Sequence, residues 1–144
     1  MDPENTFFRF WYARALAFNG QLEQAAAVIE SDLKDAGQNL WAWLGRLFLF
    51  ALRGETARVS EPITEERRKL LLWDETFSLL MAECLASIDE KEEALNWLEN
   101  SASRGLLNYP FLSQYDRFLE NLRGEPRFRR LMAQARNQSE LIEV

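Results

Sequence analysis

The sequence repeats one pattern of residues at an interval of 34 to 35 positions, and this period constrains the fold more than any other feature. The repeated positions are Ala13, Ala17, Gly20 and Ala25, then Leu47, Ala51, Gly54 and Val59, then Ala82, Ala86, Asp89 and Ala94. Larger apolar residues keep the same register at Leu16, Phe50 and Leu85, and at Ile29, Ile63 and Leu98. A period of this length is typical of helical hairpins that stack side by side.

The residue types within the pattern have physical reasons. A small residue midway along one helix allows the next helix to approach closely. Gly20 and Gly54 are expected to end their helices in the left-handed conformation, which costs glycine little. In the third set, Asp89 and Glu92 have the spacing of a capping box that opens the following helix.

These stretches resemble the tetratricopeptide repeat family. The segments ARALAFNGQLEQAAAVIE and LLMAECLASIDEKEEALNWLE look like two copies of its helix-turn-helix unit. The tail GLLNYPFLSQYDRFLENLRGEPRFRRLM is similar to the segment that closes the C-terminal repeat domains of some bacterial signalling proteins. The resemblance spans roughly residues 6 to 135 and implies an all-α, TPR-like α–α superhelix.

We therefore expect a single TPR-like domain over residues 1–144. It would contain repeats near 6–37, 40–72 and 75–105 and a helical C-terminal cap over 106–144. The middle repeat is expected to be irregular, because Pro62 stops its second helix and Thr64 can cap a new short helix. Helices are predicted near 5–19, 22–36, 39–53, 55–61, 64–72, 74–88, 90–104, 115–122 and 126–140.

Charge and composition exclude several classes of function. The net charge of -6 argues against nucleic acid as a partner. No basic region opens a signal peptide, and the apolar run over 40–52 is too short to cross a bilayer, so no membrane association is expected. The only cysteine, Cys84, excludes an intrachain disulfide and favours a reducing, cytoplasmic location.

The sequence offers no catalytic constellation, so we predict that the chain is not an enzyme. Histidine is absent, which removes the commonest general base and zinc ligand. Cys84 lies on an apolar stripe with Leu80 and Ile88 and reads as a buried thiol. Neither a phosphate-binding glycine loop nor a metal-ligand spacing is present. No catalytic, cofactor-binding or metal-binding residue is predicted, and no cofactor is expected.

Two surfaces are candidates for binding. The family resemblance implies a concave groove, in which the polar members would orient a protein or peptide, although the C-terminal helices could fill it instead. The groove positions are Phe10, Arg14, Leu44, Phe48, Leu79 and Glu83. The first helix is apolar on most sides, and its second aromatic stripe needs a cover from an upstream segment, a second copy or this chain's own helices. The candidate self-association residues are Phe7, Phe8, Trp11 and Tyr12.

A basic cluster marks the C-terminal part. Six arginines fall between Asp116 and Arg136, among them Arg123, Arg127, Arg129 and Arg130. They have three interpretations. They are surface charges that pair with the acidic body of the chain, a docking site for an acidic partner, or a contact for nucleic acid, which the net charge disfavours.

The function predicted from the sequence is that of a non-catalytic protein–protein interaction module. The resemblance implies that it is the C-terminal or regulatory part of a larger bacterial signalling protein. Two alternatives remain open at this point. One is an intramolecular structural domain that orients a neighbouring catalytic or sensor domain. The other is a regulatory domain that binds a small molecule or peptide in an apolar groove.

Overall fold

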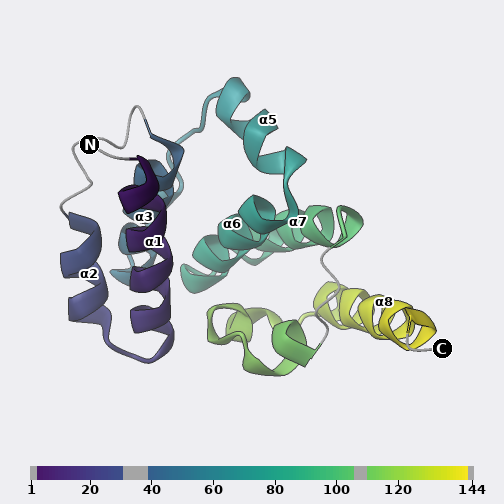
Figure 1. Cartoon of the computed structure of the whole chain (residues 1–144). Helices are drawn as coiled ribbons and strands as arrows, with labels where there is room; N and C mark the ends of the chain where they lie inside the picture. The colour runs from purple at the N-terminus through teal and green to yellow at the C-terminus, as the bar shows by residue number, and fades with distance from the viewer. Residues whose placement is uncertain (1–2, 31–38, 106–109, 143–144) are drawn as a thin grey trace. The chain divides into compact units, whose positions relative to one another are not determined.

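The computed structural model describes residues 3–30, 39–105 and 110–142, and the side chains of 3–5, 139 and 141–142 lie outside this description. Across these residues the chain is helical and contains no strand, which confirms the all-α class (Figure 1). The elements are α1 (Pro3–Phe18), α2 (Leu22–Glu30), α3 (Leu40–Leu52), α4 (Thr56–Val59), α5 (Glu65–Trp73), α6 (Glu75–Ser87), α7 (Lys91–Ser103), the π-helical η2 (Phe111–Tyr115), the 3-10 helix η3 (Arg117–Leu122) and α8 (Pro126–Ile142).

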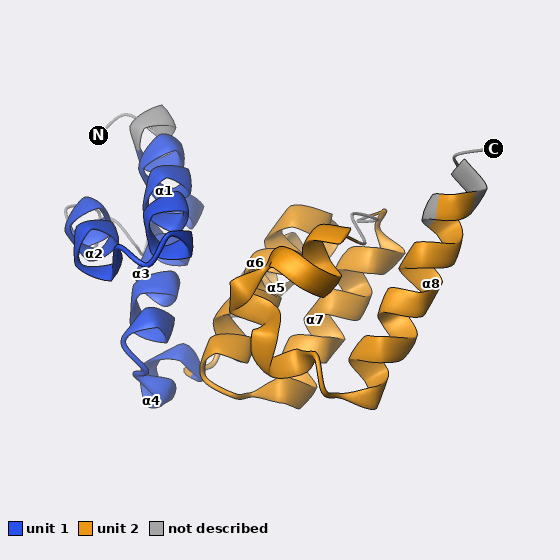
Figure 2. Ribbon diagram, turned by 90° about the horizontal axis from the view of Figure 1, so that it is seen from below, with its two compact units in different colours: residues 1–60 blue, residues 61–144 orange. Residues whose placement is uncertain are grey.

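The chain forms two compact units, residues 1–60 and residues 61–144, which Figure 2 shows in different colours. The boundary falls inside the segment predicted as the middle repeat. In the first unit, α1 and α2 form a hairpin and α3 packs against both helices. In the second unit, α6 and α7 form the central hairpin, and α5, η3 and α8 pack against it.

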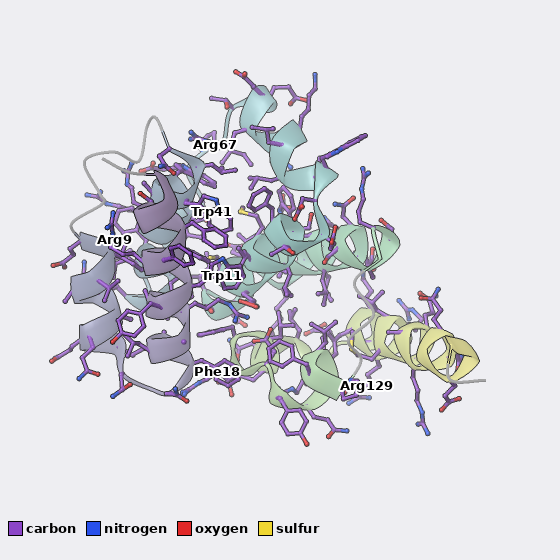
Figure 3. The ribbon with its side chains drawn as sticks, viewed as in Figure 1. Arg9, Trp11, Phe18, Trp41, Arg67 and Arg129 are labelled. Carbon is purple, nitrogen blue, oxygen red and sulfur yellow. The ribbon has the colours of Figure 1, made fainter. Side chains whose placement is uncertain are left out.

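Aromatic rings fill the core of the first unit. Phe10 is buried, and its ring lies 5.4 Å from Trp41 and 5.9 Å from Phe48, measured between centroids. Trp11 and Trp41, both labelled in Figure 3, have centroids 6.0 Å apart. The alanines of the repeat pattern, Ala13, Ala17 and Ala25, are buried, as expected where helices approach closely. α3 begins at an asparagine cap, because Asn39 Oδ1 accepts hydrogen bonds from the backbone of Trp41 and Ala42.

Three turns, one in each repeated set, close with the same hydrogen bonds. The amides of Gln21, Glu55 and Glu90 donate to the carbonyls of Leu16, Phe50 and Leu85, at 2.9, 2.9 and 3.0 Å. The residue before each donor has a positive φ, at Gly20 (83°), Gly54 (69°) and Asp89 (65°). This is the left-handed helix ending that the glycines predict.

At Asp89 the capping-box prediction was wrong. The N-cap of α7 is Glu90, and no side-chain hydrogen bond caps that helix. Asp89 instead takes the left-handed conformation that glycine takes in the other two turns. Aspartate is one of the few residues other than glycine that occasionally adopt this conformation, so the third turn keeps its geometry without glycine.

The predicted break at Pro62 is confirmed. α4 ends at Val59, and α5 begins only at Glu65, after Thr64 Oγ1 accepts a hydrogen bond from the amide of Arg67 at 3.2 Å. The new helix continues through Trp73, one residue beyond the predicted end.

Polar side chains cap and join the helices of the second unit. Asp74 caps α6 by accepting hydrogen bonds from the amides of Thr76 and Phe77 at 2.8 and 3.0 Å. Ser101 Oγ on α7 donates to the carbonyl of Glu75 at 2.6 Å. At the other end of α6, Asn121 Nδ2 of η3 donates to the carbonyl of Ala86 at 3.0 Å.

α8 begins at Pro126, as predicted, and an ion pair fastens it to α7. Arg127 donates two hydrogen bonds to the carboxylate of Glu99, at 3.1 and 3.0 Å, and a third to Asn96 Oδ1 at 2.8 Å. The hydrogen bond with Glu99 raises the pKa of Arg127 above its ordinary value. Of the predicted basic cluster, this arginine therefore pairs with the acidic body of the chain.

Candidate interaction surfaces

The six residues predicted to line a groove lie mostly in the interior. Phe10, Leu44 and Phe48 are buried in the core of the first unit, and Leu79 and Glu83 on α6 are also buried. Glu83 is 1% exposed, although a ligand-orienting carboxylate would need to be accessible. Only Arg14 keeps part of its side chain in contact with solvent. The repeat register therefore placed five of the six residues at inward-facing positions, and ligand binding in a groove stays a prediction.

The aromatic face predicted on α1 is exposed. Phe8 and Tyr12 are 63% and 60% exposed, and Phe7 and Trp11 are partly exposed. Phe7 also packs edge-to-face on Trp41, with centroids 4.8 Å apart, so the face continues into the core of the first unit. Large exposed aromatic side chains at helical spacing are typical of interfaces. Self-association through this face stays a prediction.

The structure adds an apolar surface that the sequence did not indicate. Leu70 and Trp73 lie one turn apart on α5 and are 54% and 75% exposed. They line a shallow depression together with Glu65, Glu66 and Lys69, and we call these five residues the α5 patch. The guanidinium of Arg104 lies 5.1 Å from the centroid of the Trp73 ring, within the range of a cation–π interaction. This contact restrains the ring while most of it remains accessible.

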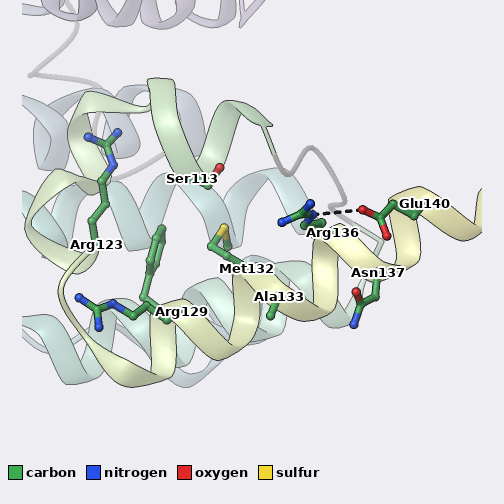
Figure 4. Close-up of a pocket in the computed structure, with 9 residues that line it drawn as sticks. Ser113, Arg123, Arg129, Met132, Ala133, Arg136, Asn137 and Glu140 are labelled. Carbon is green, nitrogen blue, oxygen red and sulfur yellow. Dashed lines mark hydrogen bonds and ion pairs between the residues drawn. The ribbon is translucent and has the colours of Figure 1, made fainter.

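A second surface, which we call the α8 groove, has a volume of about 490 Å³. Figure 4 shows most of its residues along one side of α8 and Ser113 opposite them. The lining consists of Ser113, Arg123, Phe128, Arg129, Met132, Ala133, Arg136, Asn137 and Glu140. Arg136 pairs with Glu140 at 3.1 Å on the exposed surface. Phe128 and Met132 are buried and form an apolar floor.

Within the α8 groove, Arg123 and Arg129 have no ion pair with a carboxylate among the described residues. Arg123 Nη2 donates to the carbonyl of Asp116 at 3.0 Å, whereas its Nε is buried without a hydrogen-bond partner. The sequence grouped Arg123 and Arg129 with Arg127 and Arg130, but neither of the latter two lines the groove. A helical-wheel reading of α8 would have joined Arg129 to Arg136, which lies two turns further along.

Three further features of the described part of the chain concern metal ligands, the cysteine and membrane-spanning helices. No group of three or more Cys, Asp and Glu side chains there could hold a metal ion. Cys84 is buried, as predicted, and forms no disulfide. Among the described helices, none has the length and apolar character to span a membrane. In comparisons with known proteins, the chain matched no family model, no curated protein and no solved structure.

Proposed function

We propose that this chain is a non-catalytic module that binds another protein, and that the α5 patch is its main contact surface. The observation that carries the proposal is the exposure of Trp73, at 75%, beside Leu70 at 54%. Tryptophan and arginine are the residues most enriched at the energetic centres of protein interfaces, and Arg104 already lies against the Trp73 ring. An apolar pair with charged neighbours has the composition of an interface centre and its rim.

The rigid position of the helix that carries the α5 patch supports this role. The α5 patch lies on a short helix that begins after Pro62, and hydrogen bonds from Ser78 and Asn100 to the carbonyls of Leu71 and Leu72 hold its C-terminal end. A rigid position reduces the conformational entropy lost on binding, so a restrained tryptophan is a better anchor than a mobile one. Because the Trp73 side chain is mostly exposed, its position does not stabilise the isolated chain.

The repeat architecture is part of the same proposal. We interpret the hairpins α1–α2 and α6–α7 as TPR-like units, with the segment around α4 and α5 as an irregular unit between them. The identical hydrogen bonds at the three left-handed turns support this interpretation. The bacterial signalling context follows only from the sequence resemblance, and the cytoplasmic location follows from the single cysteine.

A photo-crosslinking experiment tests the α5 patch. Benzoylphenylalanine replaces Trp73 in one variant and Tyr115, which is 64% exposed in the same unit, in a matched control. Each variant is expressed in the cells that make the natural protein, and adducts are identified by mass spectrometry after irradiation. We expect a discrete protein adduct at position 73 that is absent at position 115. Binding of the purified partner should then weaken at least tenfold in Leu70→Ser.

Two outcomes would contradict the assignment of the α5 patch. One is the same set of adducts at both positions, which indicates nonspecific encounters. The other is no adduct at position 73, together with unchanged binding of every identified partner in Leu70→Ser. Purified protein that shows saturable enzymatic turnover would contradict the non-catalytic part.

A further inference from the structure

We propose that the α8 groove binds an acidic peptide segment of a protein partner, and that Arg129 and Arg136 each take one carboxylate of that segment. The proposal rests on the proposed function in one respect, because its ligand is again a protein. It uses residues remote in sequence from the α5 patch, so either surface can be tested without the other.

The charge of the groove selects an anionic ligand. Three arginines and one glutamate line it, whereas the whole chain has a net charge of -6. Arg129 has no carboxylate partner among the described residues. Arg136 is paired only with Glu140, four residues along the same helix, and both side chains are more than 60% exposed. An exposed pair of this kind contributes little stability, so a ligand carboxylate can replace Glu140 at low cost.

The spacing of the arginines favours a peptide over a compact anion. Figure 4 shows Arg129 near one end of the groove and Arg136 near the other, beside Glu140. Seven residues of helix separate them, which corresponds to about 10 Å along the axis. A single phosphoryl or carboxylate group is too small to contact both guanidinium groups. In a polyproline II segment, residues i and i+3 lie on the same side and about 9 Å apart, which matches this separation.

The floor of the groove suits the residues between the two acidic positions. Met132 lies between Arg129 and Arg136 on the same helix (Figure 4), and Phe128, which directly precedes Arg129 in the sequence, also lines the groove. Methionine adapts its shape to different apolar partners, so the floor accepts an aliphatic side chain of the ligand. The preferred ligand therefore has two acidic residues at i and i+3 with proline or aliphatic residues between them.

Fluorescence anisotropy with a labelled peptide tests this assignment on the full chain. The probe contains Glu-Pro-Leu-Glu flanked by glycines, and a control peptide has Gln at both acidic positions. We expect saturable binding of the Glu probe that weakens with added salt and is absent for the Gln control. Arg129→Gln and Arg136→Gln should each weaken binding about tenfold, the effect of losing one charge-assisted hydrogen bond.

Arg130→Gln is the matched control, because Arg130 is exposed on the same helix but does not line the groove. It removes the same charge and should leave binding nearly unchanged. Equal weakening by Arg130→Gln and Arg129→Gln would indicate a diffuse charge effect and overturn the site. Equal binding of a peptide with adjacent acidic residues, Glu-Glu-Pro-Leu, would overturn the spacing. Displacement of the probe by millimolar inorganic phosphate, at constant ionic strength, would identify a compact-anion site instead. None of these results would change the adduct expected at Trp73.

Discussion

Asn100 on α7 donates its side-chain amide to Ser78 Oγ on α6 at 2.8 Å, and the same amide donates to the carbonyl of Leu72 on α5 at 2.8 Å. Ser78 Oγ in turn donates to the carbonyl of Leu71 at 2.9 Å. One asparagine therefore joins three helices and satisfies carbonyls at the end of α5. Because the α5 patch lies on that helix, the network also holds the proposed contact surface in place.

Removal of this amide is expected to destabilise the second unit. Asn100→Ala leaves the Leu72 carbonyl without its side-chain donor in a partly buried site, so the free energy of unfolding should fall by about 1–3 kcal/mol. Thermal and urea unfolding measure the change. Asn137→Ala, at an exposed position on α8, is the control and should melt like the parent. Equal stability of Asn100→Ala and the parent would contradict the network's contribution.

Substitution at the repeated alanines tests the helix contacts of the first unit. Ala17 and Ala51 are buried, so Ala17→Leu and Ala51→Leu should overpack the helix contacts and cost about 1–3 kcal/mol each. Ala15→Leu places the same side chain at an exposed position of α1 and should change stability little. Melting curves that do not separate Ala17→Leu from Ala15→Leu would show that the packing at Ala17 is loose.

Substitutions at two of the left-handed turns should change the free energy of unfolding with opposite signs. Asp89→Gly should stabilise the chain by up to about 1 kcal/mol, because glycine adopts the positive φ without the steric cost of a side chain. Its ion pair with Lys91 is long, at 3.7 Å, and exposed, so the loss of the carboxylate matters little. Gly54→Ala should lower the free energy of unfolding by about 1 kcal/mol, because a residue with a side chain is strained at this positive φ. The strain is conformational, since an added methyl group there meets no other atom. Differential scanning calorimetry of both variants gives the two signs.

The exposed aromatic face of α1 predicts self-association. A homodimer would bury Phe8 and Tyr12, and Phe8→Glu should restore the mass of one chain in light scattering. Tyr115→Glu changes a side chain of similar exposure in the other unit and should leave the dimer intact. A wild-type protein that stays monomeric at high micromolar concentration would exclude this pairing.

The sequence predicted the features that depend on local chain geometry. Gly20 and Gly54 identified two helix ends, and Pro62 with Thr64 identified the break before α5, because backbone restrictions act over a few residues. The role of Asp89 was missed for a related reason. Aspartate serves both as a helix cap and as a left-handed residue, and the tertiary position of the turn decides between the two.

The candidate surfaces were harder to predict, because accessibility depends on which helix covers which face. Phe48 and Trp73 are both aromatic residues on helices, yet Phe48 is buried and Trp73 is exposed. Hydropathy alone does not separate them. In the basic cluster, Arg127 and Arg129 are two residues apart, and only packing determined that Arg127 faces Glu99 while Arg129 faces the α8 groove.

In the first unit the helices pair mainly with their neighbours along the chain, and this has a consequence for biosynthesis. In the first unit, α1 meets α2 and then α3, and in the second unit α6 meets α7. Contacts between residues that are close in sequence cost little loop-closure entropy, so units built from such contacts fold quickly. Residues 1–60 contain all the helices of their own unit. That unit can therefore begin to fold while the ribosome is still synthesising α6 and α7, and its aromatic core is shielded before the chain is complete.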